Sequence, residues 1–298
     1  MNVTVVIPAL NAVATLPAQL EALDEQVGAP VFRVIVVDNG STDSTGACAA
    51  GFPARHFDIE VVHEPVRGIN SARNAGAAAA LDGAVLLCDA DDLVHPGWVA
   101  AMTSALVAGG WVGGRLDYLR LNSPRTRLVW GAPDLSSYAE TDPFVDTTYG
   151  CNCGFWRSMW EELLGFDASI SGTGGDETEF FMRAWGAGYR RVDAADAIVS
   201  YRLRAGVRTM LRQRYRQGRN QVVLGTLAGG RLLPGALTAA GTRRALAYRV
   251  LAVPKYVWRA SARYAWSASV ALHLGRLRGF RRVAHGASAN PPRRRGRA

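Results

Sequence analysis

A short apolar run that ends in three carboxylates constrains this chain more than any other feature. Residues 84–88 are all apolar, and Asp89, Asp91 and Asp92 follow at once, interrupted only by Ala90. A continuous apolar run of this length predicts a strand buried on both faces, as in a mostly parallel sheet. Ligands of such sheets bind beyond the carboxyl ends of the strands. The run therefore predicts an α/β protein with an acidic ligand site.

The spacing of the three acids predicts what they bind. Like charges crowded together raise the free energy unless a cation or a proton relieves them. Mg²⁺ and similar hard divalent cations take oxygen ligands, often one or two protein carboxylates together with substrate phosphates. A divalent metal, Mg²⁺ or Mn²⁺, with a bound diphosphate fits this pattern. A solvated acidic turn is the alternative for a D-x-D pair taken alone.

Strand and helix patterns alternate through the first 120 residues, which predicts right-handed βαβ units and a Rossmann-like sheet flanked by helices. After residue 121 the pattern is less regular, with a loop-rich segment and then a largely helical end. The expected strands are residues 1–8, 32–37, 59–62, 84–88, 111–121, 189–192 and 197–201, and the expected helices are residues 11–26, 71–81, 98–108, 155–164, 176–187 and most of the chain from residue 209.

Charge divides the chain sharply. Residues 1–196 carry 12 basic and 25 acidic side chains, a net charge of −13, whereas residues 197–298 carry 22 basic side chains and no acid. An acid-free, Arg-rich end implies an anionic partner, such as a phospholipid surface, a diphosphate-bearing lipid or nucleic acid. The four cysteines lack zinc-site spacing, and we expect a reduced, cytoplasmic setting. Neither a leader peptide in residues 1–20 nor an apolar segment of ~20 residues is evident.

Three polar loops follow the strands that precede the acidic run. Residues 6–11 leave the first strand, Asp38 ends the second, and residues 67–74 bring Arg73 to the start of a helix. A carboxylate can accept a hydrogen bond from a base or ribose, and a guanidinium beside free helical N–H groups suits a diphosphate. Each loop is also an ordinary turn when taken alone.

Together, these motifs resemble family 2 glycosyltransferases of the GT-A fold. The matching segments are VVIPALN at 5–11, VVDNGSTD at 36–43, RGINSARNAG at 67–76 and CDADD at 88–92, and the resemblance covers roughly residues 1–200. It implies an inverting, metal-dependent transfer of one sugar from a nucleotide-diphospho-sugar. The residues it implies for the donor site are Pro8, Ala9, Asn11, Asp38, Arg73 and Asp89, with Asp91 and Asp89 on the metal and Asp92 behind them.

A catalytic base is expected in the Gly-rich segment 172–179, because an attacking hydroxyl must lose its proton. The segment resembles the Gly-Glu-Asp motif of the family with its acids reversed, so Glu177 and Asp176 are both candidates. Asp176 and Glu179 also fit a helix capping box. On the acceptor side, the resemblance points to Asn152 and Trp156, although aromatic residues at helical spacing are commonly core.

Two departures from the family pattern narrow the prediction. Ser200, Tyr201 and Arg202 stand where many GT-A enzymes carry a metal-binding histidine, and the Gln-x-x-Arg-Trp motif of processive synthases has only a partial counterpart at 213–217. Single-sugar transfer to a glycan or lipid-linked acceptor of the cell envelope is therefore expected, with a catalytically silent nucleotide-sugar-binding protein as an alternative. A nucleic-acid-binding protein is the less favoured alternative.

The resemblance and the charge division together predict the domain organisation. We expect a GT-A domain at residues 1–205, with a nucleotide-binding half at about 1–120 and an acceptor half at about 121–205. A basic helical extension at 206–288 and a disordered Arg-rich tail at 289–298 should follow. Lys255, Arg259 and Arg263 recur at every fourth residue, which predicts a basic helical stripe within residues 240–298. Such a stripe suits an anionic membrane surface. The alternative is a helical appendage that packs on the GT-A core and leaves its arginines solvated.

Overall fold

The computed structural model describes residues 1–107, 109–136, 148–170, 175–227, 237–256 and 258–284, which form two compact units. The first unit ends at Arg202, near the boundary predicted at residue 205. Asn122–Pro133 and Ser169–Gly175, which were expected in the first domain, belong to the second unit together with the chain from Leu203 onward. The tail predicted at 289–298 lies outside the described residues.

In the described residues, the first unit contains an eight-stranded sheet in the order β3-β2-β1-β4-β7-β6-β8-β5. The first four strands in this order are parallel, β7 is antiparallel to both β4 and β6, and β8 is parallel to β6. The predicted α/β fold with a mostly parallel sheet is confirmed. The strands are β1 (Asn2–Ala9), β2 (Arg33–Asp38), β3 (Asp58–His63), β4 (Gly83–Cys88), β5 (Leu93–Val94), β6 (Trp111–Asp117), β7 (Asn152–Trp156) and β8 (Arg191–Ser200).

Helices cover both faces of this sheet. Successive side chains of a strand point to opposite faces, so neighbouring residues of one strand pack into different cores. Val5 and Leu86 pack into a core with α1 and α4, whereas Val6 and Val85 pack into a second core with α3, α6 and α7. The helices of this unit are α1 (Leu16–Asp24), α2 (Thr45–Ala50), α3 (Ile69–Ala79), α4 (Trp98–Val107), α6 (Arg157–Glu162) and α7 (Asp176–Gly186).

Three secondary-structure predictions for the middle of the chain were wrong. Phe155 and Trp156 belong to β7 rather than a helix, because Phe155 pairs with Val85 in the centre of the sheet. The two short strands expected near the end of the unit are one continuous strand, β8. The loop-rich segment contains a helix, α5 (Pro124–Trp130), which begins where the Ser123 hydroxyl accepts a hydrogen bond from the Thr126 N–H at 3.1 Å.

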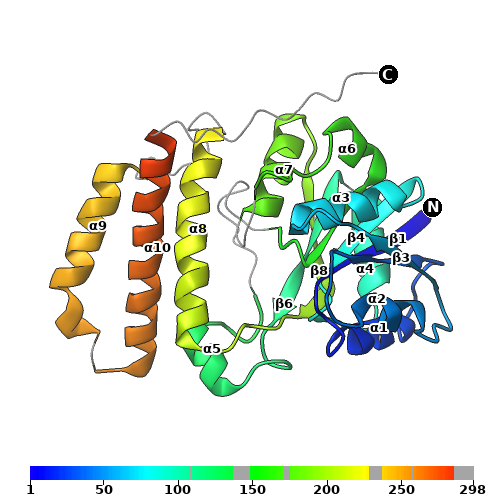
Figure 1. Ribbon diagram of the computed structural model, residues 1–298, viewed down its shortest axis with the longest axis horizontal. Helices are drawn as coiled ribbons and strands as arrows, with labels where there is room; N and C mark the ends of the chain where they lie inside the picture. Colours follow the sequence, from blue (N-terminus) through cyan, green and yellow to red (C-terminus); the bar gives the residue numbers. More distant parts are fainter. Residues whose placement is uncertain (108, 137–147, 171–174, 228–236, 257, 285–298) are drawn as a thin grey trace. The chain divides into compact units, whose positions relative to one another are not determined.

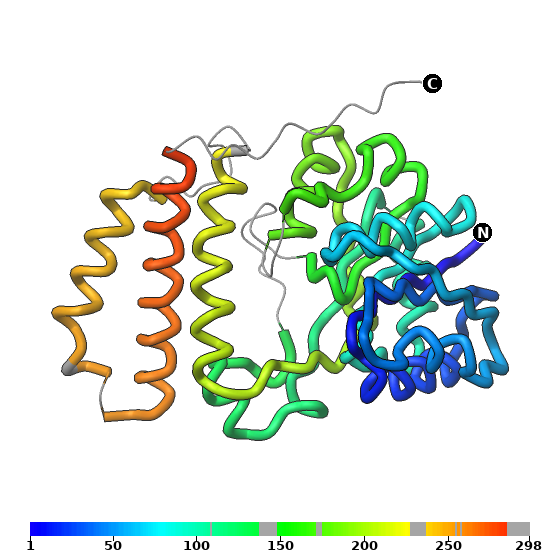
Figure 2. Tube along the Cα trace, viewed as in Figure 1, coloured from blue at the N-terminus to red at the C-terminus, as the bar shows by residue number. Residues whose placement is uncertain are grey.

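The second unit is helical, as the sequence predicts. Besides α5 it contains α8 (Val207–Leu227), α9 (Ala239–Leu251), the 3₁₀ turn η1 (Val253–Lys255) and α10 (Ala260–Ala284), and α10 packs against α8 and α9 (Figures 1 and 2). Glycines let α8 and α10 approach closely, since a Cβ atom on Gly275 would lie 2.0 Å from the Tyr215 carbonyl oxygen. Among the described residues, no helix has both the length and the apolar character needed to cross a bilayer.

The basic stripe expected on one helix was also wrong. Lys255 closes η1, and Arg259 precedes α10, which begins at Ala260. Only Arg263 lies within α10. The 3₁₀ turn and the start of α10 at Ala260 therefore break the helical periodicity that would align the three cations.

Candidate active site

The carboxyl ends of three parallel strands meet at one edge of the sheet. β1 lies between β2 and β4, so Ala9, Asp38 and Cys88 end their strands side by side. β7 runs in the opposite direction and its first residue, Asn152, pairs with Cys88. This pairing brings the start of β7 to the same edge. Pro8 and Ala9, expected at the nucleotide pocket, are buried at the end of β1.

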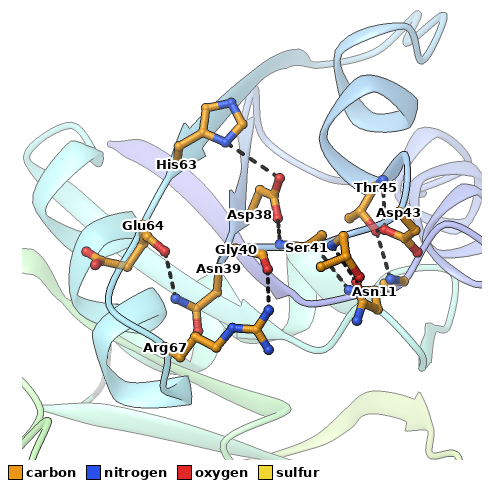
Figure 3. A network of polar contacts seen from close by, with 12 residues as sticks. Asn11, Asp38, Asn39, Gly40, Ser41, Asp43, Thr45, His63, Glu64 and Arg67 are labelled. Carbon is orange, nitrogen blue, oxygen red and sulfur yellow. Dashed lines mark hydrogen bonds and ion pairs between the residues drawn. The ribbon is translucent and has the colours of Figure 1, made fainter.

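Hydrogen bonds join the loops after β1 and β2 (Figure 3). Asn11 has a φ of 53°, a left-handed conformation that asparagine tolerates. Its N–H donates to the Ser41 hydroxyl at 3.0 Å, and its side-chain oxygen accepts from the Thr42 N–H at 2.8 Å. Asp38 accepts from the Ser41 N–H at 2.9 Å, and its second oxygen lies 3.5 Å from His63 Nδ1. Two expected donor-site residues, Asn11 and Asp38, therefore share Ser41 as a partner.

Asn39 ties the loop after β3 to the same network (Figure 3). Its side-chain amide donates to the carbonyls of Glu64 at 2.9 Å and Val66 at 2.8 Å, and accepts from the Gly68 N–H at 2.8 Å. Its own N–H donates to the Ala9 carbonyl at 2.9 Å. One buried side chain thus organises the loops that precede α2 and α3.

The acidic loop after β4 separates its carboxylates by burial. Asp91 is exposed, whereas Asp92 is 1% exposed and accepts from the Arg202 N–H at 2.7 Å. Burial, reinforced by the charges of Asp89 and Asp91, raises the pKa of Asp92 well above its usual range. The buried amide of Gln19 in α1 supports this loop by donating to the Asp89 carbonyl at 3.2 Å. The loop therefore has one exposed carboxylate, Asp91, and one buried carboxylate, Asp92.

The donor atoms at this edge fit a hard divalent cation. Within the described part of the chain, ligand atoms of Asp89, Asp92 and Cys151 lie within 4.8 Å of one another. Asp92 Oδ2 is buried and has no hydrogen-bond partner among the described residues, so a cation nearby would relieve it. Burial raises the pKa of the Cys151 thiol, which leaves the carboxylate oxygens as the suitable ligands for Mg²⁺ or Mn²⁺.

Arg73 is buried instead of facing solvent. Its side chain is 4% exposed, and Nη1 lies 2.9 Å from Asp176 Oδ2 and 3.8 Å from Glu177 Oε2. Gly150 leaves the necessary space, since a Cβ there would lie 2.1 Å from Arg73 Nη2. The negative charges of Asp176, Glu177 and Asp89 all raise the pKa of Arg73. Arg73 thus joins α3 to the first turn of α7.

The two candidate bases have different surroundings. Asp176 is 5% exposed and committed to Arg73, whereas the Glu177 side chain retains 17% exposure. Burial, with the charge of Asp176 adding to it, raises the pKa of Glu177 to about 8, although Arg73 opposes this rise. The capping box expected at this helix start does not describe Glu179, which instead pairs with Arg183 at 2.6 Å.

Neither of the expected acceptor-side residues has its side chain available to an acceptor at this edge. Asn152 is fully buried, and its amide donates to the carbonyls of Arg115 and Ala197 and accepts from Trp98 Nε1. These bonds fill the bulge between β6 and β8, so Asn152 has a structural role. Trp156 lies at the other end of β7, paired with Ala84, where it packs against both cores.

Sequence reasoning missed three residues that shape the site: Gln19, Asn39 and Cys151. Gln19 had a detectable signal, because it falls on the helix face that carries Leu16, Leu20 and Leu23. A polar side chain on a buried face needs partners. Cys151 had no such signal, because its position depends on the antiparallel pairing of β7 with β4.

The profile of glycosyl transferase family 2 matches residues 4–164, and the chain belongs to this family. An uncharacterized glycosyltransferase of Mycobacterium tuberculosis (strain ATCC 25618 / H37Rv) is 40% identical over 107 residues, 36% of this chain and 44% of that protein. The chain therefore matches less than half the length of this relative. Glycosyltransferase AglE of Haloferax volcanii is 25% identical over 224 residues, 74% of this chain and 73% of AglE.

Solved structures support the same fold. The mannosyltransferase PcManGT from Pyrobaculum calidifontis, in complex with GDP-Man and Mn²⁺, has a TM-score of 0.65 at 21% identity. The match covers 93% of this chain and 86% of that chain. The GT-A fold expected from the motifs is confirmed.

Proposed function

We propose that this protein transfers one sugar from a nucleotide-diphospho-sugar to an acceptor hydroxyl with inversion at the anomeric carbon. The observation that carries the proposal is the approach of Arg73 Nη1 to Glu177 Oε2, at 3.8 Å, in a chain of family 2 whose acidic loop begins with Asp89 directly after β4. The GDP-Man and Mn²⁺ bound to PcManGT support a nucleotide-sugar donor and a divalent cation.

The donor nucleotide binds along the joined loops after β1 and β2. Pro8, Ala9 and Asn11 form one wall, and Asp38 contacts the base or ribose. Asp89 and Asp91 hold Mg²⁺ or Mn²⁺, with the exposed Asp91 free to follow the diphosphate. A cation held there would supply positive charge to the leaving nucleoside diphosphate.

Glu177 is the base in this proposal, and Asp176 is its positioning partner. The acceptor oxygen forms its bond to the anomeric carbon as the bond to the diphosphate oxygen breaks, and Glu177 takes the hydroxyl proton. Such a base contributes on the order of 10²–10⁴-fold. Its raised pKa matches this task, because a base with a pKa near the working pH is strong enough to accept the proton yet still ionised in part.

The acceptor is a glycan or a lipid-linked sugar of the cell envelope, and transfer takes place in the cytoplasm. The four cysteines, which are free in the structure, support a reducing compartment. Single-sugar transfer is favoured over chain extension because the processive-synthase motif is incomplete at residues 213–217.

Thermal unfolding with nucleotides tests the donor site directly. UDP, GDP, dTDP and CDP are each added with and without Mn²⁺. A ligand at 100 times its dissociation constant stabilises the folded state by about 2.7 kcal/mol. We expect one nucleotide to raise the melting temperature in a Mn²⁺-dependent manner, and the responsive nucleotide names the donor base. An unchanged melting temperature with all four nucleotides would contradict the proposal.

A further inference from the structure

The junction of α9 and α10 in the second unit exposes large apolar side chains. We call residues 248–256, 258 and 259 the elbow. In its described part, Trp258 is 87% exposed, Leu251 81%, Val250 60% and Tyr248 56%. Single exposed apolar residues are ordinary, but several within one short segment mark a surface that another apolar phase covers.

The elbow also carries exposed cations. Lys255 and Arg259 are exposed within the elbow, and the sequence from residue 197 to residue 298 contains no acidic side chain. The positive charge of the elbow is therefore not neutralised by carboxylates of its own segment. Exposed apolar side chains interleaved with cations are the composition of a segment that binds an anionic lipid interface.

The elbow is held in shape by contacts within the second unit. Arg249 donates to the Tyr256 hydroxyl at 3.3 Å, and its carbonyl accepts from Trp266 Nε1 at 2.9 Å. A cavity of about 320 Å³ opens among these residues, with a mainly apolar lining that includes Tyr256, Trp266 and Val253. A mainly apolar hollow beside exposed apolar side chains suits hydrocarbon better than it suits a polar partner.

We propose that the elbow docks this protein on a bilayer that contains anionic phospholipid. Val250, Leu251 and Trp258 enter the boundary between headgroups and acyl chains, and Lys255 and Arg259 meet lipid phosphates. Nucleic acid is the less favoured partner, because aliphatic side chains such as Val250 and Leu251 offer no surface on which bases stack. Docking through the elbow does not depend on the proposed sugar transfer.

Co-sedimentation of the full chain with vesicles tests the proposal. The vesicles contain phosphatidylcholine alone or phosphatidylcholine with phosphatidylglycerol, and binding is expected with the second kind. L251S/W258S should weaken binding about tenfold or more, because two apolar anchors are lost. Trp258→Phe should retain binding. Val31→Ser is the matched control, because Val31 is 92% exposed but lies in the first unit.

A charge series completes the test. K255E/R259E should reduce binding to anionic vesicles at least about tenfold, whereas R120E/R125E, with the same change in net charge, should not. All variants should keep the parent melting temperature, since the substituted side chains are exposed. Vesicle binding that is the same in the elbow variants as in the parent protein, or no vesicle binding at all, would overturn the proposal. Binding of single-stranded RNA without vesicle binding would also overturn it and favour a nucleic-acid partner.

Discussion

Arg73 and Asp176 form a buried ion pair, with Nη1 2.9 Å from Oδ2, although 103 residues separate them in the sequence. Arg73 belongs to α3, and Asp176 begins α7. Asn70, one turn before Arg73, donates to the Asp176 carbonyl at 3.2 Å and strengthens the same junction. The pair therefore holds the first turn of α7, which includes Glu177, against α3.

Removal of Arg73 should destabilise the protein strongly. Breaking a buried pair leaves an uncompensated charge and costs about 3–5 kcal/mol. Arg73→Met should therefore lower the free energy of unfolding by about that amount, measured by urea denaturation. Arg73→Met combined with Asp176→Asn should recover a large part of the loss, because no buried charge is then left alone. Additive losses in the double variant would contradict the pairing.

Glu177 should give activity and stability opposite dependences on pH. The pKa of this carboxyl is raised to about 8 from an ordinary value of 4.5. Activity that requires the ionised base should rise with pH and level off above about 8. The folded state keeps a proton that the unfolded chain releases, so its stabilising contribution is complete below pH 4.5 and is lost as pH rises through about 8.

Glu177→Gln provides the control for both measurements. The variant should lose most of the sugar transfer at every pH. Its free energy of unfolding, measured by urea denaturation at several pH values, should fall less steeply than that of the parent between pH 4.5 and 8. If parent and variant show the same pH slope, Glu177 does not hold the extra proton.

Asp91 and Asp92 should separate ligand binding from folding. Asp91→Ala should keep the parent melting temperature, because Asp91 is exposed, but should lose the Mn²⁺-dependent stabilisation by nucleotide. Asp92→Ala should lower the free energy of unfolding by about 1–3 kcal/mol, because the Arg202 N–H loses its acceptor. Asp92→Asn should fold nearly as well as the parent, since the raised pKa of Asp92 already favours an uncharged side chain. A nucleotide shift that survives in Asp91→Ala would remove Asp91 from the metal site.

The sequence predicted most elements of the first 120 residues and the sheet edge at which the candidate residues follow their strands, because those depend on local patterns. The apolar run before Asp89 and the polar loop after Asp38 need only the periodicity of a strand and the rule for parallel sheets. The role of Asn152 could not be predicted in this way. It depends on the irregular register between Gly113 and Arg115, a property of strand pairing that no local pattern records.

The surroundings of Arg73 could not be predicted from the sequence for a similar reason. Arg73 was expected at the diphosphate because of its place at a helix start, and near the base because of the family resemblance; its pairing with Asp176 was not foreseen. That pairing depends on where α7 begins relative to α3, which is set by the packing of both helices on the same face of the sheet.

Gly76 should be required for the packing of α3 on the sheet. A Cβ at this position would lie 2.2 Å from Val6 Cγ1, too close for the buried core to accommodate without movement. Gly76→Ala should lower the free energy of unfolding by about 1–3 kcal/mol, the usual range for overpacking. Gly186→Ala is the matched control in α7, where a Cβ meets nothing within 4 Å, and should be neutral or stabilising. Equal effects in urea denaturation would contradict this account.

Asn39 should control both the stability and the nucleotide affinity of the three joined loops. Asn39→Ala removes two donors and one acceptor from a side chain that is 4% exposed. Each buried group left unpaired costs about 1–3 kcal/mol, so we expect a clear loss in the free energy of unfolding. Nucleotide affinity, measured by calorimetry on the folded variant, should also fall, because the loops after β1 and β2 lose their link to Gly68. Asn39→Asp should be no better, since a carboxylate cannot donate to the Glu64 and Val66 carbonyls. Thr42→Ala is the matched control, because it removes only the exposed 3.2 Å hydroxyl contact with Asn11 and leaves the backbone bonds in place.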